Sequence, residues 1–599
     1  MELYRKISDL LTRPEKIRLI GIFFMVLFMG LLEAVGVASM LPFLLVLTDP
    51  SQIEDRATLS ALYAFGGFED RDTFLIALGF GVFALLLLSL TFKMLTLYVM
   101  SHFVNWRRYH LSRRMLESYY RQPYAWFLDR HSSDLAKNVL SEVDQVMQTS
   151  LLPSMLVIAH SVVVLSLVTL IVIIDPVVAL TAGAVIGGLY ALIYLVVRKM
   201  LTRLGAMRVQ AVSERFRAAQ EGLGGIKDVK VLSLEDAYLA RFAAPSRTLA
   251  RCATLAALVG ELPRHLLEAV LFGGMLALVL VLLLRSDGTL AGILPVVGLY
   301  AFAGLRMFPA MQQVYRWLTE LRYGRKSLEL VHADLMETRK GLVAVPDPLP
   351  PGLPLTRELC LEDVHFAYPS AARPALQGLT MRIPAKTTIG IVGGTGAGKT
   401  TAVDILLGLL SPTAGRLTVD GLAVEGERVF AWRQRVGYVP QSIYLIDDTV
   451  AGNIAFGVPR DEIDMAAVER VARIAELHDF VSTELPKGYE THVGERGVRL
   501  SGGQRQRIGI ARALYRDPDV LILDEATSAL DNITERAVMG AVNNLAHAKT
   551  VVMIAHRLTT VRGCDRIFLL EKGRVIDEGS YDELLETSET FRAMALGVN

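Results

Sequence analysis

The chain has 599 residues, of which 52% are apolar, and its mean hydropathy is positive. This length predicts more than one domain, and this composition excludes a protein that is soluble along its whole length. The formal net charge is only +1, so no overall electrostatic field indicates a nucleic-acid-binding protein.

The three cysteines, Cys252, Cys360 and Cys564, lie far apart in the sequence. Their spacing argues against a disulfide framework or a zinc site and fits a reducing cytoplasm. The first residues, Met1 to Lys6, carry charges of both signs, and no small-residue cleavage site follows a short apolar run. We therefore predict no cleaved signal peptide.

Six apolar stretches in the first half of the sequence are long enough to span a bilayer. They are Ile17 to Leu47, Phe74 to Met100, Leu151 to Ile174, Val177 to Val197, Leu255 to Leu284 and Leu290 to Phe308. Six spans place both termini on the same side of the membrane. The polar connection after the first span includes Ala57 to Ala64, which has the pattern of a short amphipathic helix lying at the membrane interface.

Basic residues are concentrated in two connections, between spans two and three and between spans four and five. Because cytoplasmic loops carry an excess of lysine and arginine, these connections and both termini are predicted to be cytoplasmic. The orientation of the chain in the membrane accounts for the position of these arginines, so they do not require a nucleic-acid-binding site. Both connections have helical patterns, so they should continue the membrane helices out of the bilayer. Pro123 to Phe127 and Gly224 to Lys230 are their turning points, either as docking sites for another domain or as plain helix corners.

The proline-rich segment Val343 to Gly352 cannot continue a helix and marks a domain boundary. We predict a transmembrane domain over residues 1–340, a linker over 341–357 and a second domain over 358–599. The second domain begins with a β-rich pattern and continues with alternating α and β patterns. These patterns predict a doubly wound fold.

The second domain contains the phosphate-loop pattern Gly-x-x-x-x-Gly-Lys-Ser/Thr, from Gly393 to Thr400. Thr388 to Val392 before it reads as a buried strand, and Ala402 to Leu407 after it as a helix. In such a loop the backbone N–H groups face a phosphate, Lys399 adds a charge to the β/γ-phosphates, and Thr400 offers a hydroxyl to Mg²⁺. The alternative is a glycine turn beside a surface lysine.

Two further segments supply polar groups suited to the same chemistry. The apolar run Val520 to Leu523 ends in Asp524 and Glu525, as expected of a buried strand that delivers charge at its C-terminal end. Asp524 can hold Mg²⁺ through water, and Glu525 is then positioned to orient or deprotonate an attacking water. The serine and glycines of Ser501 to Gln504 predict a second phosphate-facing turn at the head of a helix.

Occurring together and in this order, these motifs resemble those of ATP-binding-cassette (ABC) transporters of the exporter type, and the resemblance extends over essentially the whole chain. It implies that Tyr368 stacks on adenine, that Gln441 senses the γ-phosphate and Mg²⁺, and that His556 is the switch histidine rather than a structural one. It also implies that Ser501 to Gln504 is the signature motif. Ser528 to Asp531 would be the dimer-contact loop, and Thr491 to Gly497 the loop that contacts the membrane domain.

The nucleotide contacts implied by this resemblance are Tyr368, Gly393, Gly394, Thr395, Gly396, Ala397, Gly398, Lys399, Thr400, Thr401, Gln441, Ser501, Gly502, Gly503 and Gln504. The implied catalytic residues are Glu525, His556 and Lys399, and the implied Mg²⁺ contacts are Thr400, Gln441 and Asp524.

The resemblance also implies the fold and the assembly. The expected fold is an α-helical six-span membrane domain of the exporter type, followed by an α/β P-loop nucleotide-binding domain with a β-rich and a helical subdomain. In this family the signature of one subunit completes the ATP site of the other. One cassette and six spans per chain therefore imply a symmetric homodimer in the inner membrane, with both termini and the nucleotide-binding domain in the cytoplasm.

Three short segments bear on the cargo. Glu261 to Glu268, Leu305 to Pro309 and Arg108 to His110 resemble flippases that move lipid-linked oligosaccharides, the polyprenyl-pyrophosphate glycans of bacterial protein glycosylation. The long connection after the first span resembles these flippases too. A lipid A-core flippase and a multidrug exporter are the alternatives among transporters.

Soluble ABC ATPases that act on DNA or ribosomes share the nucleotide motifs but lack the six spans. An importer usually keeps its membrane domain on a separate chain, and a peptide exporter with its own protease domain needs more sequence before Ile17.

Three cations fall within predicted spans: Lys93 late in span two, Arg264 early in span five and Arg306 late in span six. The direction of each span places all three in or near the cytoplasmic half of the bilayer. Charged side chains at this depth usually line a functional cavity, and arginine suits a pyrophosphate. We therefore predict a cargo site from these three residues. Alternatively, Lys93 extends to the inner surface and the arginines pair with Glu261, Glu268 or Glu33.

Overall fold

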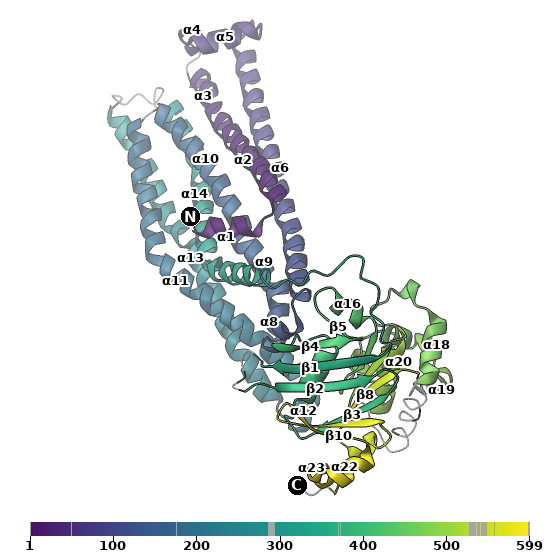
Figure 1. Ribbon diagram of the computed structural model, residues 1–599. Helices are drawn as coiled ribbons and strands as arrows, with labels where there is room; N and C mark the ends of the chain where they lie inside the picture. The colour runs from purple at the N-terminus through teal and green to yellow at the C-terminus, as the bar shows by residue number, and fades with distance from the viewer. Residues whose placement is uncertain are drawn as a thin grey trace. The chain divides into compact units, whose positions relative to one another are not determined.

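The computed structural model describes residues 2–285 except 49, 50 and 175, and residues 294–596 except 369, 370, 372, 526–534, 536–539, 541–547 and 556. The chain divides into two compact units (Figure 1). Unit 1 comprises Met1–Tyr120 and Arg130–Leu342, and unit 2 comprises Arg121–Asp129 and Val343–Asn599.

Unit 1 is helical throughout its described part. Its α-helices are α1 (Glu2–Leu10), α2 (Arg13–Ala38), α3 (Met40–Thr48), α4 (Gln52–Asp55), α5 (Ala57–Phe65), α6 (Arg71–Tyr120), α8 (Ser132–Lys137), α9 (Val143–Val146), α10 (Leu152–Ile174), α11 (Pro176–Gly224), α12 (Ile226–Val231), α13 (Glu235–Arg285) and α14 (Leu294–Thr338). Two π-helical segments, η1 (Asn138–Glu142) and η2 (Met147–Leu151), lie between α8 and α10.

Three helices of unit 1 are much longer than a bilayer is thick. α6, α11 and α13 have 50, 49 and 51 residues. At 1.5 Å per residue each is about 75 Å long, against a hydrocarbon core of about 30 Å. The predicted helical extensions beyond the membrane are therefore present.

Four helical stretches in the described part of the chain are long and apolar enough to cross a membrane, namely Arg13–Thr48, Arg71–Tyr120, Ser132–Ile173 and Gly183–Gly224. They contain the first four predicted spans, apart from a few residues. The fifth predicted span lies within α13. The sixth lies in α14 from Leu294 onward, and its first residues, 290–293, are outside the described part.

The connection after the first span contains the predicted short helix, as α5. Leu59 of α5 is buried in one apolar cluster with Val46 and Phe74. The ring of Tyr63 meets that of Phe74 in a T-shaped, edge-to-face arrangement at a centroid distance of 5.1 Å. These contacts tie α5 to the ends of the two helices that it connects.

The π-helical segments pack closely against α14 and α11. A Cβ atom added at Gly324 of α14 would lie only 1.9 Å from Thr149 Oγ1 of η2, so only glycine allows this approach. Glu142 of η1 is fully buried and lies 3.4 Å from the guanidinium of Arg208 on α11. π-Helical turns are rare, and their local widening places Glu142 and Thr149 in these contacts.

Unit 2 is built on two sheets. A four-stranded antiparallel sheet has the order β2-β1-β4-β5, with β1 (Glu358–Phe366), β2 (Leu376–Pro384), β4 (Ala414–Val419) and β5 (Leu422–Ala423). A six-stranded sheet has the order β10-β9-β3-β8-β7-β6, with β3 (Thr388–Gly393), β6 (Val436–Val439), β7 (Val520–Asp524), β8 (Thr550–Ile554), β9 (Arg566–Glu571) and β10 (Arg574–Gly579). All neighbouring strands of the second sheet are parallel except β10 with β9.

The helices of unit 2 surround these sheets. They are α7 (Tyr124–Leu128), α15 (Lys399–Leu406), α16 (Arg428–Arg433), α17 (Val450–Ile454), α18 (Met465–Ile474), α19 (His478–Thr483), α20 (Gly502–Leu514), α22 (Tyr581–Thr587) and α23 (Glu589–Leu596), with the 3₁₀ turns η3 (Arg460–Glu462), η4 (Gly488–Glu490), η5 (Glu495–Gly497) and η6 (Leu558–Val561). Strands β3, β7 and β8 are buried along their whole length, as their continuous apolar sequences require. Because β6, β3, β7 and β8 are parallel, their carboxyl ends meet at one edge of the sheet.

Candidate functional site: a phosphate loop and two carboxylates

The phosphate loop follows β3 and has a backbone that only glycine adopts easily. Gly393, Gly396 and Gly398 have φ values of 153°, 77° and 101°. A Cβ at Gly393 would lie 2.3 Å from the carbonyl oxygen of Leu570, whereas nothing lies within 4 Å of a Cβ at Gly394 or Gly396. The loop is therefore tight on its sheet side and open on the other, as a phosphate cradle must be.

Lys399 begins α15 and reaches back over this loop. Its Nζ donates to the carbonyl oxygens of Gly393 and Gly394 at 2.8 and 3.0 Å, and the residue is only 7% exposed. Burial lowers the pKa of Lys399, while the nearby Glu525 and Asp524 oppose that change. Loop, lysine and carboxylates thus form one electrostatic group, as the sequence predicts. Thr400 and Thr401 follow in the first turn of α15.

The two carboxylates stand at the carboxyl end of β7, next to β6 and β8. Asp524 is 9% exposed, and Tyr438 of β6 donates to its Oδ2 at 3.4 Å. Gln441 Nε2 donates to Glu525 Oε2 at 2.7 Å. Glu525 has a φ of 49°, which is uncommon for a residue other than glycine and directs its side chain away from the strand. The structure therefore brings together Gln441 and Glu525, which sequence reasoning had placed in one site.

Sequence reasoning did not identify two further groups next to Asp524, the buried carboxyl of Asp404 and the half-buried phenol of Tyr438. Asp404 lies on α15 one turn after Thr400 and is 8% exposed. Burial and the nearby Asp524 raise its pKa to about 6. Burial, followed by Asp524 and Asp404, raises the pKa of Tyr438. The spacing from Thr400 to Asp404 is the only sequence signal that could have indicated the carboxyl.

Helix α7 belongs to unit 2, as the docking interpretation of Pro123 to Phe127 predicts. Ala125 packs against the apolar core around β3. Burial raises the pKa of the Tyr124 phenol, and Asp404 and Tyr368 add to this effect. A segment distant in sequence thus contacts the unit close to the phosphate loop. The second predicted docking stretch forms α12 in unit 1, and its docking stays a prediction.

Tyr368 also lies next to the loop. Its hydroxyl is 3.0 Å from Thr401 Oγ1, and its ring meets that of Phe366 edge to face at a centroid distance of 5.0 Å. The ring packs against the core on one side and is half-buried. This position is compatible with the predicted stacking on a base.

The predicted signature forms the start of α20. Ser501 Oγ accepts from Gln504 N at 3.2 Å, and Gln504 Oε1 accepts from Ser501 N at 2.8 Å, which is a capping box. Ser501 is exposed, and Gly502 and Gly503 are partly exposed. The first N–H groups of a 13-residue helix are therefore accessible to an anion.

Of the three other predicted elements, only the stretch before the signature lies within the described residues. The stretch Thr491 to Gly497 is anchored beside α17, because Val450 N donates to Thr491 O and Val493 N donates to Asp448 O, each at 3.0 Å. His556 and the loop Ser528 to Asp531 lie outside the described residues.

The described residues of the phosphate loop and the β7 edge fit MgATP. A glycine cradle open on one side, a buried lysine and two adjacent carboxylates are the groups that a triphosphate with its metal requires. When bound, Mg²⁺ neutralises charge on the phosphates.

In unit 1 the three predicted cargo cations do not form one group. Lys93 Nζ lies 2.8 Å from Glu33 Oε1, and a guanidinium nitrogen of Arg306 lies 3.9 Å from the same oxygen. Glu33 is 5% exposed. Arg264 instead pairs with Glu268 one turn along its own helix, at 3.3 Å. The predicted alternative pairings of the two arginines with Glu33 and Glu268 are thus present.

Comparison with known families gives two matches. The family model for the ABC transporter transmembrane region matches residues 17–283, and the ABC transporter model matches residues 376–528. An ATP-dependent lipid A-core flippase of Cupriavidus metallidurans is 32% identical over 493 residues, which cover 82% of this chain and 81% of the relative. The heterocyst differentiation ATP-binding protein HepA of a Nostoc species is 34% identical over 61% of this chain and 59% of its own.

A solved structure has the same fold over nearly the full length. It is a bacterial Atm1-family ABC exporter with ATP bound, which is 25% identical, has a TM-score of 0.76, and matches over 97% of this chain and 98% of its own. The predicted family, fold class and ATPase activity are confirmed. The chain therefore belongs to the ABC transporters, as an exporter-type half-transporter in which a helical membrane domain is followed by an ATPase domain that drives transport.

Proposed function

We propose that the protein works as a homodimer in the inner membrane and uses ATP to flip a glycosylated lipid whose phosphate or pyrophosphate lies next to its apolar tail. The termini and the ATPase domain would face the cytoplasm. A charge group within the membrane helices carries this proposal. We call Glu33, Lys93 and Arg306 the Glu33 cluster.

The Glu33 cluster joins three helices, α2, α6 and α14, and contains two cations and one anion. Its carboxylate oxygen Oε1 is close to both cations, while Oε2 is buried and has no hydrogen-bond partner among the described residues. His160 of α10 interacts electrostatically with Lys93 and Glu33. An excess positive charge at this depth is costly unless a ligand or water meets it. An anionic lipid headgroup would supply the missing charge.

For the energy source, we propose that Thr400, Gln441 and Asp524 hold Mg²⁺ and that Glu525 acts as the base toward water. One chain carries one phosphate loop and one signature. If the Ser501 helix of one subunit faces the loop of its partner, a symmetric dimer has two complete sites. Lys399, Tyr368 and His556 keep the roles that the motifs predict.

The first cargo candidate is a polyprenyl-pyrophosphate glycan, because a pyrophosphate can accept from lysine and arginine together. The second is the lipid A core, which is favoured by the name of the Cupriavidus relative. Both cargoes are anionic glycolipids. A neutral hydrophobic drug does not need the Glu33 cluster.

Flipping assays in proteoliposomes test this function. Labelled polyprenyl-pyrophosphate glycan, lipid A core and a neutral drug are each supplied with ATP. Arg306→Gln and the double variant Glu33→Gln/Lys93→Gln should keep basal ATPase activity and lose most anionic lipid transport. The double variant avoids leaving Glu33 buried without a partner.

Arg264→Gln is the matched control, because Arg264 is also a membrane cation but lies outside the Glu33 cluster. Normal transport by Arg264→Gln, with loss in the cluster variants, supports a two-cation site. Loss of lipid transport in the cluster variants and in Arg264→Gln supports the three-cation site predicted from the sequence. Normal lipid transport by every variant contradicts the cargo proposal.

A further inference from the structure

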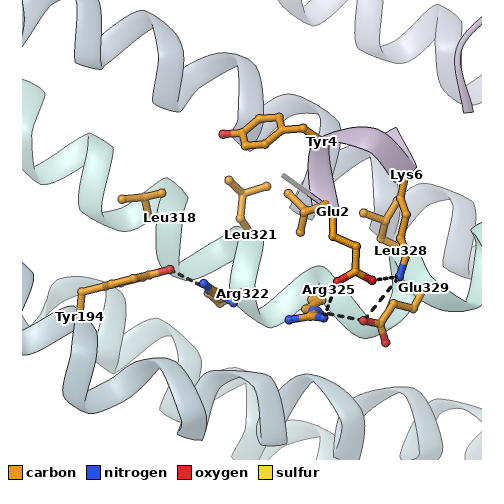
Figure 2. Close-up of a pocket in the computed structure, with 11 residues that line it drawn as sticks. Glu2, Tyr4, Lys6, Tyr194, Leu318, Leu321, Arg322, Arg325, Leu328 and Glu329 are labelled. Carbon is orange, nitrogen blue, oxygen red and sulfur yellow. Dashed lines mark hydrogen bonds and ion pairs between the residues drawn. The ribbon is translucent and has the colours of Figure 1, made fainter. Parts of the chain in front are cut away.

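A cavity of about 240 Å³ lies between the N-terminal helix α1 and the long helices α11 and α14 (Figure 2). Figure 1 shows α1 lying across the long helices of unit 1. Tyr4 and the leucines Leu318 and Leu321 give the cavity an apolar part, and charged side chains of the same two helices, α1 and α14, give it a polar part (Figure 2). The cavity thus has the two kinds of lining that an amphiphile needs.

The polar part has one cation more than it has anions. Lys6 and Arg325 are balanced by Glu2 and Glu329, with Lys6 to Glu2 and Arg325 to Glu329 both at 2.8 Å. Arg322 has no carboxylate within 4.0 Å among the described residues. Its Nε donates to Tyr194 Oη at 2.7 Å, which fixes the guanidinium plane. Its two terminal nitrogens make no hydrogen bond within the described part of the chain and are available to an anion.

A second cavity, of about 270 Å³, lies on the other side of Tyr4, between α1, α2 and α10. Its lining is mainly apolar and includes Phe23, Met155 and Ile158. Tyr4 lines both cavities. A lipid with its charged head in the first cavity would reach the second with its apolar chain if that chain passed Tyr4.

The topology predicted from the sequence puts both cavities at the level of the cytoplasmic membrane surface. Helix α1 ends just before the membrane-crossing stretch that begins at Arg13. Tyr194 lies near the cytoplasmic end of the predicted span Val177 to Val197. Polar headgroups of the inner leaflet occupy this depth.

We propose that this cavity binds one anionic phospholipid of the cytoplasmic leaflet, with its phosphate on Arg322 and an acyl chain past Tyr4. The oxygens of a phosphate diester would accept hydrogen bonds from the Arg322 guanidinium, which Tyr194 already orients. Arg322 is about sixteen residues from Arg306 on the same helix, which is about 24 Å at the rise of an α-helix. This lipid site is therefore separate from the Glu33 cluster and does not depend on the identity of the cargo.

Native mass spectrometry of the full-length protein tests the site. The protein is equilibrated with mixed micelles of phosphatidylglycerol and phosphatidylcholine, and retained lipid is counted. The wild type should retain phosphatidylglycerol in preference to phosphatidylcholine. Arg322→Gln should weaken this retention about tenfold or more, as expected for the loss of a charged hydrogen-bonding partner. Arg322→Lys should retain an intermediate amount.

Two further variants show whether a loss of lipid retention in Arg322→Gln comes from the cavity itself. Arg316→Gln on the same helix removes an exposed cation outside the cavity and should retain the lipid as the wild type does. Leu321→Trp fills the apolar part without changing the charge and should lose the lipid, which keeps the test valid if Arg322→Gln does not fold. Equal loss of lipid in Arg316→Gln, or unchanged lipid retention in Arg322→Gln or in Leu321→Trp, overturns the proposal. Displacement of the lipid by millimolar inorganic phosphate would also overturn it, because the occupant would then be a soluble anion.

Discussion

The side-chain amide of Gln441 donates a 2.7 Å hydrogen bond to the carboxylate of Glu525. Glu525 comes directly after β7, and Gln441 follows the end of the neighbouring parallel strand β6. The pairing of these two strands therefore fixes the distance between Gln441, the proposed sensor of the γ-phosphate, and Glu525, the proposed base. A movement of the segment after β6 would change the position of Glu525 through this bond.

Glu525→Gln should bind ATP with nearly unchanged affinity and hydrolyse it at least about a hundredfold more slowly. The amide keeps the size and can still bond to Gln441, but it cannot accept a proton from water. ATPase turnover and nucleotide binding, both measured on purified protein, check this prediction. Turnover close to that of the wild type would remove Glu525 from the catalytic role.

Lys399→Ala should lose ATP affinity or turnover while keeping the fold. Among the described residues, Lys399 Nζ bonds only to the loop carbonyls of Gly393 and Gly394. Water can replace the lysine there, so thermal unfolding should change little. Nucleotide titration together with ATPase assays gives the measurement, and normal values in both would contradict the assignment.

Tyr368→Phe and Tyr368→Ala separate stacking from hydrogen bonding. Phe keeps the ring and loses only the bond to Thr401, so the apparent KM for ATP should rise little. Ala removes the ring and should raise the KM several-fold. Unfolding of both variants would instead identify Tyr368 as a core residue that packs on Phe366.

Local patterns in the sequence predicted much of this structure. Thr388 to Val392 is a strand, the glycine loop and helix α15 follow it, and Ala57 to Ala64 lies within α5. Each of these depends on neighbouring residues alone. The separation of Arg264 from the Glu33 cluster depends on which helix faces are turned toward each other, and the spans themselves contain no such information. The π-helical turns were also not predicted, because they depend on packing against α14.

The pKa of Asp404 predicts how stability depends on pH. Its value rises from 3.8 to about 6 on folding, mainly through burial. Well below pH 3.8 the carboxyl is protonated in both states and costs nothing. As the pH rises toward 6, the Asp404 carboxyl ionises in the unfolded state before it does in the folded state. The free energy of unfolding therefore falls, by about 3 kcal/mol at most. Asp404→Asn should therefore unfold at a higher temperature than the wild type at pH 7, and the difference should shrink as pH falls from 6 to 4. A difference that does not depend on pH would contradict this assignment.

The close contact between α14 and η2 gives the last prediction. Gly324→Ala should destabilise the membrane domain by about 1–3 kcal/mol, because the new methyl group would overlap Thr149. Gly304→Ala is the matched control on the same helix, since nothing lies within 4 Å of a Cβ at that position. It should be neutral or stabilising by about 0.5–1 kcal/mol, because alanine favours a helix. Thermal unfolding of both variants in the same detergent measures the difference. Equal unfolding temperatures would show that η2 and α14 can separate at no cost, and the glycine contact would then not be what fixes their distance.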